Sequence, residues 1–235
     1  MPVISLLNML KLALLLSAFL LSQGCAAESV CRGSTSKGSL ENGVKLPEQG
    51  QNFKAYSSLA VSIGRTHVHS KVARVVTAAY ARLEETVPDK VFVYGETGWA
   101  KGGKFQPHRT HQNGLSVDFM VPVVDEQGRS VPLPTHVGNK FGYDIEFDAQ
   151  GRYNGLAIDF EALAEHLYQL DAEAKRHKIG LGLIILDPPY LPKLFATKRG
   201  AYLQTHLKFM KRKAWVRHDE HYHIDFVVPC KPFPA

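Results

Sequence analysis

The hydrophobic and polar positions of this chain follow two periods, and the longer one predicts helices. Apolar residues recur every three or four positions over residues 70–86 and again over residues 159–177. His166 and His177 fall within the second of these helices, and we expect both to be exposed. A third helix is expected over residues 202–212, where it would present a basic face.

The shorter period, in which apolar and polar residues alternate, predicts strands. It is clearest over residues 115–120 and 222–228, and short apolar runs predict two further strands at residues 91–94 and 179–186. Residues 125–153 are rich in glycine, proline and charge and show only weak periodicity. We expect this segment to form a long excursion on the surface.

The two ends of the chain carry signals for export and for a disulfide. An apolar run at residues 12–21, followed by small residues, predicts a signal peptide over residues 1–27. The alternatives are lipidation at Cys25 or a retained anchor, either of which would associate the protein with a membrane through its N-terminus. Cleavage of the signal leaves Cys31 and Cys230, which we expect to form a disulfide in an oxidising compartment.

Composition and charge indicate the class of partner. A chain of 235 residues with 45% apolar and 21% charged residues suits one globular domain with short extensions. The net charge of +6 favours an anionic partner, but the chain has no nucleic-acid-binding motif and its export argues against nucleic acid. An acidic cell-wall polymer or a membrane surface fits better, although a solvated helix face is the alternative. The basic residues cluster before the last predicted strand, at Lys208, Lys211, Arg212, Lys213 and Arg217.

Histidine and aspartate residues gather in two distant segments. His221, His223 and Asp225 project from one face of the last strand, and one strand cannot complete a tetrahedral metal site. The best partner segment contains His111 and Asp118. Asp118 lies within an otherwise apolar strand, where an unpaired carboxylate is costly. Either a metal ion or a salt bridge to a nearby arginine would explain its position.

Three of these residues form a plausible catalytic zinc site. His111, Asp118 and His223 supply two nitrogens and one oxygen, which leaves the fourth position of a tetrahedral ion for water. Zinc lowers the pKa of such a water to about 7 and polarises carbonyl groups, so peptide hydrolysis becomes accessible near neutral pH. His221 is placed to take the proton from that water or to stabilise the oxyanion, and His218, further back in the loop, can assist it.

The motifs resemble a known family. His-x6-Asp followed by a distant His-x-His resembles the zinc peptidases that include lysostaphin-type enzymes, D-Ala-D-Ala peptidases and the hedgehog fold. Within this group, the chain is most similar to the penicillin-insensitive murein endopeptidases. The resemblance rests on Gly-Gly-x-Phe before His108-x-x-His111-Gln112-x-Gly114-Leu115-x-Val117-Asp118, and on His218-x-x-His221-x-His223. It implies His111, Asp118 and His223 as zinc ligands, His221 as catalytic base and His218 as its assistant.

Two departures from the family pattern affect what can be carried over. Some relatives have a further Asp-x-x-His that, with a residue like His108, holds a second metal. Residues 148–153, which correspond to that motif, contain no histidine. The resemblance therefore implies neither a second metal here nor a role for His108 in binding one. Relatives also tend to have a basic residue where this chain has Asp225. That change would alter substrate preference or hold His221 or His111 by a hydrogen bond.

The resemblance implies an α+β fold, in which a small antiparallel sheet carries the zinc site on one face and helices pack on the other. Residues 28–60 would form an N-terminal arm and residues 61–235 the zinc peptidase domain. The implied protein is a periplasmic zinc metallopeptidase that hydrolyses the D-alanyl–meso-diaminopimelyl cross-link of peptidoglycan through a metal-activated water. The alternatives are a D,D-carboxypeptidase, an L,D-endopeptidase, or an inactive wall-binding module in which alanine at His221 changes nothing.

Overall fold

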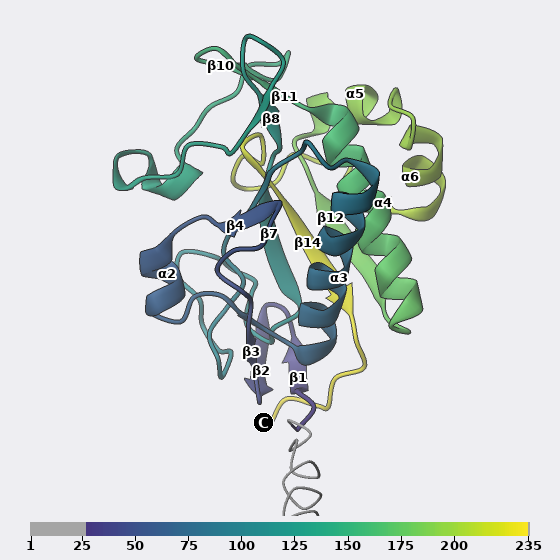
Figure 1. Cartoon of the computed structure of the whole chain (residues 1–235). Coiled ribbons are helices and arrows are strands. Elements are labelled where there is room, and N and C mark those ends of the chain that lie inside the picture. Colours follow the sequence, from purple (N-terminus) through teal and green to yellow (C-terminus); the bar gives the residue numbers. More distant parts are fainter. Residues whose placement is uncertain (1–26, 235) are drawn as a thin grey trace, which may run out of the picture.

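A six-stranded sheet forms the centre of the molecule, in a computed structural model that describes residues 27–234. The strand order is β13-β12-β14-β7-β6-β4. Figure 1 labels β12, β14, β7 and β4 of this sheet. All four predicted strands are present, with ends that differ from the prediction by at most one residue. In chain order the strands are β4 (Phe53–Ala55), β6 (Phe92–Tyr94), β7 (Ser116–Met120), β12 (Gly180–Ile185), β13 (Lys208–Phe209) and β14 (His221–Val227).

The sheet is mixed, whereas a wholly antiparallel one was expected. β14 pairs antiparallel with β12 and β7, and β7 pairs antiparallel with β6. The two edge strands, β4 and β13, instead pair parallel with β6 and β12. Each edge strand is joined to its neighbour through helical segments, which return the chain to the same end of the sheet and so permit parallel pairing.

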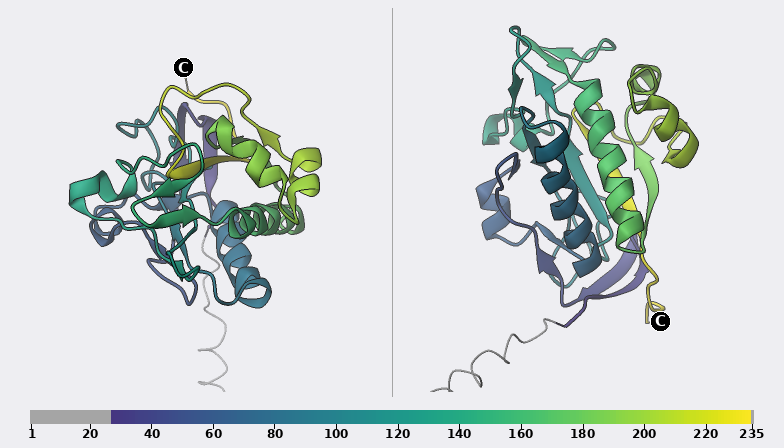
Figure 2. Two further views of the ribbon diagram at one scale, coloured as in Figure 1. Left: turned by 90° about the horizontal axis from the view of Figure 1, so that it is seen from above. Right: turned by 45° about the vertical axis from the view of Figure 1, so that its right-hand side comes forward.

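Two long helices cover one face of the sheet. α3 (Ser70–Thr86) has the predicted bounds, and α4 (Phe160–Arg176) begins after Asp159, whose side chain accepts a hydrogen bond from the Ala162 amide. The two helices lie side by side against the same face (Figure 2). The opposite face of the central strands is left for the site. The apolar stripe that α3 buries consists of Val72, Val75, Val76, Ala79 and Leu83.

His166 of α4 is buried, so the expectation that it is exposed is wrong. Its exposed fraction is 1%, and its Nδ1 lies 2.5 Å from the hydroxyl oxygen of Tyr222 on β14. Position 166 follows Leu163 by three residues and precedes Leu170 by four, which places it on the apolar face of the helix. Burial lowers the pKa of His166 to about 3. This neutral imidazole links α4 to the strand that carries the site histidines.

The third helix is shorter than predicted. α6 (Gly200–His206) ends because Leu207 adopts an extended conformation, after which β13 pairs with β12. The predicted basic helix face is therefore wrong, since Lys208 and residues 211–213 follow the helix in a strand and a loop. These residues line a cleft instead. No glycine or proline marks the early end of the helix in the sequence.

The remaining segments surround the sheet. The predicted Cys31–Cys230 disulfide is present and ties the first hairpin to the C-terminal segment. Residues 125–153 do not simply lie on the surface, because Leu133, Ile145 and Phe147 are buried in the core. The smaller elements are β1 (Val30–Ser34), β2 (Lys37–Glu41), β3 (Val44–Lys45), α2 (Ser58–Ser62), β5 (His67–Val68), β8 (Val123–Val124), β9 (Ser130–Val131), η1 (Val137–Gly142), β10 (Arg152–Tyr153), β11 (Leu156–Ile158), η2 (Pro188–Tyr190) and α5 (Leu191–Phe195).

The predicted signal peptide over residues 1–27 falls almost entirely outside the described residues. Within the part that the structure describes, every helix is too short or too polar to cross a membrane.

Candidate metal centre

The pairing of β7 with β14 brings the two histidine-bearing motifs together. The register places His223 opposite Asp118 and Asp225 opposite Ser116. Alternate residues of a strand point to opposite faces, so the residues between them point the other way. Tyr222, for example, contacts His166 of α4. The two strands therefore bury their apolar side chains under the helices and present their polar ones on the opposite face.

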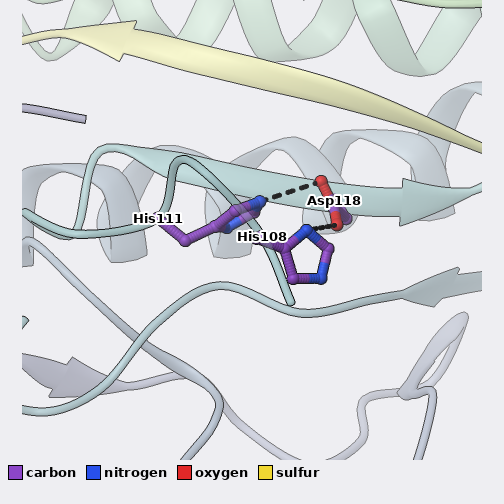
Figure 3. Close-up of side chains that lie close together, drawn as sticks. All are labelled: His108, His111 and Asp118. Carbon is purple, nitrogen blue, oxygen red and sulfur yellow. Dashed lines mark ion pairs between the residues drawn. The ribbon is translucent and has the colours of Figure 1, made fainter. Parts of the chain in front are cut away.

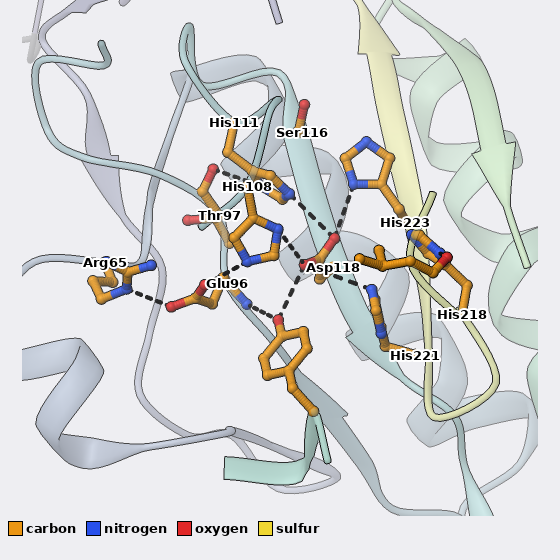
Figure 4. Close-up of polar contacts among 12 residues, drawn as sticks. Arg65, Glu96, Thr97, His108, His111, Ser116, Asp118, His218, His221 and His223 are labelled. Carbon is orange, nitrogen blue, oxygen red and sulfur yellow. Dashed lines mark hydrogen bonds and ion pairs between the residues drawn. The ribbon is translucent and has the colours of Figure 1, made fainter. Parts of the chain in front are cut away.

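The carboxylate of Asp118 is fully buried and surrounded by four imidazoles (Figure 4). Its Oδ1 lies 2.9 Å from Nδ1 of His223 and 3.2 Å from Nε2 of His111. Its Oδ2 lies 3.8 Å from Nδ1 of His108 and 4.0 Å from Nε2 of His221. Among the described residues no arginine pairs with it, so the arginine salt bridge considered from the sequence is not formed.

Each of these imidazoles is fixed through its other ring nitrogen. An oxygen acceptor lies beside that nitrogen in every case, so an N–H there donates to the oxygen and turns the remaining nitrogen toward Asp118. Metal-binding histidines are oriented in this way. The four contacts are His108 Nε2 to Glu96 Oε2 at 2.6 Å, His111 Nδ1 to the Thr97 carbonyl at 3.1 Å, His221 Nδ1 to Glu220 Oε1 at 2.7 Å, and His223 Nε2 to Asp225 Oδ1 at 2.9 Å.

The orientation of His111 gives the most direct evidence that the cluster can bind a cation. Its Nε2 is fully buried and has no hydrogen-bond partner among residues 27–234. Because Nδ1 donates to the Thr97 carbonyl, Nε2 presents a lone pair to the carboxylate of Asp118. Burial lowers the pKa of His111, which disfavours a proton on this nitrogen. A metal cation bound by both atoms removes the conflict, and a donor set of imidazole and carboxylate suits zinc.

His223 approaches the same carboxylate from the other strand. Burial lowers its pKa, but hydrogen bonds to Asp118 and Asp225 outweigh burial and raise the pKa to about 10. The imidazole therefore carries a second proton when no metal is present, and metal binding must displace it. Of the two roles expected for Asp225, the hydrogen bond to His221 or His111 is not formed, and its effect on substrate preference stays a prediction. Asp225 contacts His223 because the two residues lie two positions apart on one strand face, and it also accepts a hydrogen bond of 2.6 Å from Ser116 Oγ.

His108 belongs to the cluster, although no role was expected for it. His108, His111 and Asp118 offer ligand atoms that lie within 4.8 Å of one another (Figure 3). Burial raises the pKa of Glu96, but hydrogen bonds from His108 and Arg65 outweigh it and lower the pKa to about 2. This ionised carboxylate fixes the ring of His108. The His-x-x-His spacing to His111 was the signal in the sequence.

Tyr143 was missed by sequence analysis. Its hydroxyl donates to Asp118 Oδ2 at 3.0 Å and accepts from the Glu96 amide at 2.9 Å. Its ring packs against His221 with 5.0 Å between centroids. Tyr143 lies within residues 125–153. This segment is held a few residues further on by the buried Phe147, whose amide donates to Asp219. Tyr143 thus fixes the second oxygen of the central carboxylate.

The two predicted catalytic residues lie at one edge of the cluster. Burial lowers the pKa of His221 to about 4 and that of His218 to about 3, so both imidazoles are neutral near neutral pH and can accept a proton. Their ring centroids lie 4.5 Å apart. Nδ1 of His218 donates to the Val216 carbonyl at 3.1 Å. Both histidines line the same cleft as Asp118.

The loop that carries His108 and His111 depends on close backbone approaches. His111 itself has a φ of 67°, in the left-handed region that few non-glycine residues adopt. A Cβ on Gly98 would lie 2.8 Å from the His111 carbonyl oxygen, so only glycine fits there. Strained conformations of this kind concentrate at functional sites.

A large cleft gives access to the cluster. Its volume is about 1720 Å³, and the central residues Asp118, His221 and His223 lie in its lining. Its lining includes residues of α2 and all of residues 208–217. The cleft is large enough to admit a segment of polymer, because small-molecule sites usually enclose about 300–1,000 Å³.

Comparison with known families agrees with this geometry. Residues 31–139 match the family model of penicillin-insensitive murein endopeptidases. The matched segment contains His108, His111 and Asp118, whereas His221 and His223 lie beyond its end. No curated protein matches the chain. Residues 31–139 therefore carry the sequence of the penicillin-insensitive murein endopeptidase family, as the resemblance of the motifs indicated.

Proposed function

We propose that this protein is a periplasmic zinc metallopeptidase that hydrolyses the D-alanyl–meso-diaminopimelyl cross-links of peptidoglycan. The family match supports a peptidase that acts on murein. The observation that carries the metal assignment is the unpartnered, buried Nε2 of His111 beside the carboxylate of Asp118. Export to the periplasm is supported by the disulfide between Cys31 and Cys230, since such bonds persist in oxidising compartments.

The residues of the cluster have distinct roles in this proposal. His111, Asp118 and His223 hold the ion, which when bound supplies Lewis acidity for peptide hydrolysis. His221 accepts a proton from the attacking water at Nε2. Glu220, which lies 2.7 Å from Nδ1 of His221, stabilises the resulting imidazolium.

Neighbouring groups hold this arrangement in place. Tyr143 donates to Asp118 and so keeps its Oδ1 directed at His111 and His223. His218 lies against the ring of His221 and assists it as the base. No nucleophilic serine is needed in this scheme, which agrees with the insensitivity to penicillin that gives the family its name.

Digestion of purified sacculi tests the proposal. The zinc-loaded protein is expected to convert dimeric muropeptides to monomers, chelation to stop the conversion, and added zinc to restore it, with products identified by mass. Alanine at His221 should lower the rate by about a hundredfold or more, because it removes the general base. Alanine at His206, an exposed histidine on α6, is the matched control and should not change the rate.

Other outcomes point to other functions. Release of single D-alanine from monomers would indicate a carboxypeptidase, and cleavage at an L,D bond would indicate an L,D-endopeptidase. Sacculi that remain intact with and without zinc would indicate a wall-binding module. Full activity after chelation would contradict the metal assignment.

A further inference from the structure

We propose that residues 208–217 form a carboxylate-binding wall, called here the basic wall, which selects peptides with free carboxylates. This inference rests on the proposed function, because it names a feature of the substrate in the same cleft. The basic wall lines the same cleft as Asp118 and the histidines around it. The ligand it recognises is an acidic peptide rather than the glycan to which the peptide is attached.

Four of the five cations of the basic wall form no ion pair within the described residues. Within residues 27–234, no carboxylate pairs with Lys208, Lys211, Arg212 or Lys213. Arg217, at the end of the segment, differs because it pairs with Glu146 at 3.0 Å and Asp219 at 3.2 Å. Unpaired cations that line a cleft raise the local concentration of anionic ligands. The four unpaired residues are therefore free to bind carboxylates of a substrate.

An arginine lies between the basic wall and the histidines that surround Asp118. Arg109 follows His108 directly, and its guanidinium lies 4.4 Å from the ring centroid of Trp215 in the basic wall. Trp215 is 60% exposed and lines the cleft. Stacking fixes the plane of the guanidinium while leaving its N–H groups available, and this fork matches a carboxylate. Arg109 thus provides an oriented anion contact one residue from a histidine of the cluster.

The α2 wall, formed by Leu59, Ile63 and Phe141 in the lining of the cleft, has a different chemistry. Leu59 of α2 and Ile63, the C-cap of this helix, are 57% and 55% exposed. A ligand that fits both walls has carboxylates on one side and alkyl groups on the other. A stem peptide with alanine methyl groups and free carboxylates meets this requirement. A polyanionic phosphate polymer has no apolar groups for the α2 wall.

The test compares two cross-linked muropeptide dimers that differ only in whether their free carboxyl groups are amidated. For the wild-type protein, we expect KM to be about tenfold higher with the amidated dimer, since several exposed charge contacts are lost. The triple variant Lys211→Gln, Arg212→Gln, Lys213→Gln should raise KM for the free dimer to that level and lose discrimination. The control Lys101→Gln, Lys104→Gln, Lys198→Gln removes the same charge from exposed positions outside the cleft and should behave as wild type.

Several results would overturn the inference. Equal KM values of the wild-type protein for the two dimers would do so, as would a triple variant that still discriminates. Normal cleavage of dimers by the triple variant, together with lost binding to a purified phosphate polymer, would assign the wall to that polymer. If the wild-type protein cleaves neither dimer, the proposed function fails, and calorimetry then decides the inference separately: a tenfold difference in Kd supports it and equal Kd values refute it.

Discussion

Asparagine in place of Asp118 is expected to abolish zinc binding and to lower the rate of cross-link cleavage by about a thousandfold or more. The carboxylate is the one anion on which His111 and His223 converge, at 3.2 and 2.9 Å. Asparagine has nearly the same volume and can still accept the hydrogen bond from Tyr143, but it lacks the charge that makes the site a cation site. Zinc content and muropeptide release measure the effect.

The control for this variant is asparagine at Asp89, whose side chain is 78% exposed. That variant should retain the zinc content and the activity of the wild-type protein. Circular dichroism of both variants establishes that they are folded. Activity of the Asp118 variant within tenfold of wild type would show that the cluster does not carry the reaction.

The second large effect concerns the disulfide. Serine at both Cys31 and Cys230 should lower the free energy of unfolding by about 5 kcal/mol, because the bond closes a loop with a sequence separation of 199 and restricts the unfolded chain. The bond also adjoins the loop that carries His111, since the Asn113 side-chain amide lies 3.7 Å from Sγ of Cys230. Urea unfolding of the two proteins under oxidising conditions measures the difference.

Reducing agent provides the control for this experiment. It should shift the unfolding curve of the wild-type protein to that of the double serine variant and leave the variant's own curve in place. A difference below about 1 kcal/mol would mean that the disulfide contributes little to the stability of the fold.

The helices and the main strands were predictable because their signals are local. α3 and α4 carry apolar residues at helical spacing, and Asp159 supplies a cap. The parallel pairing of β4 and β13 has no such signal, because it depends on how the chain returns across the helices. His166 had a signal that was overlooked, since its position lies on the apolar stripe of α4.

The part of the candidate site that lies in short motifs could be predicted from the spacing of its histidine and aspartate residues. Two short motifs predict His111, Asp118 and His223 as ligands. The register of β7 with β14 places His223 opposite Asp118, and His111 reaches the same carboxylate from the preceding loop. Tyr143 could not be found, because it lies in an aperiodic segment and reaches Asp118 only through the folding of a distant turn. Similarly, Glu96 supports His108 from a loop whose sequence contains no pattern that indicates this contact.

The central claim is that two distant segments share one zinc ion, and anomalous diffraction at the zinc edge from zinc-loaded crystals tests it most directly. We expect a single strong peak about 2.0–2.2 Å from Nε2 of His111, Oδ1 of Asp118 and Nδ1 of His223. A peak within bonding distance of His108 but not of His223, or no peak beside Asp118, would contradict the proposed set of zinc ligands.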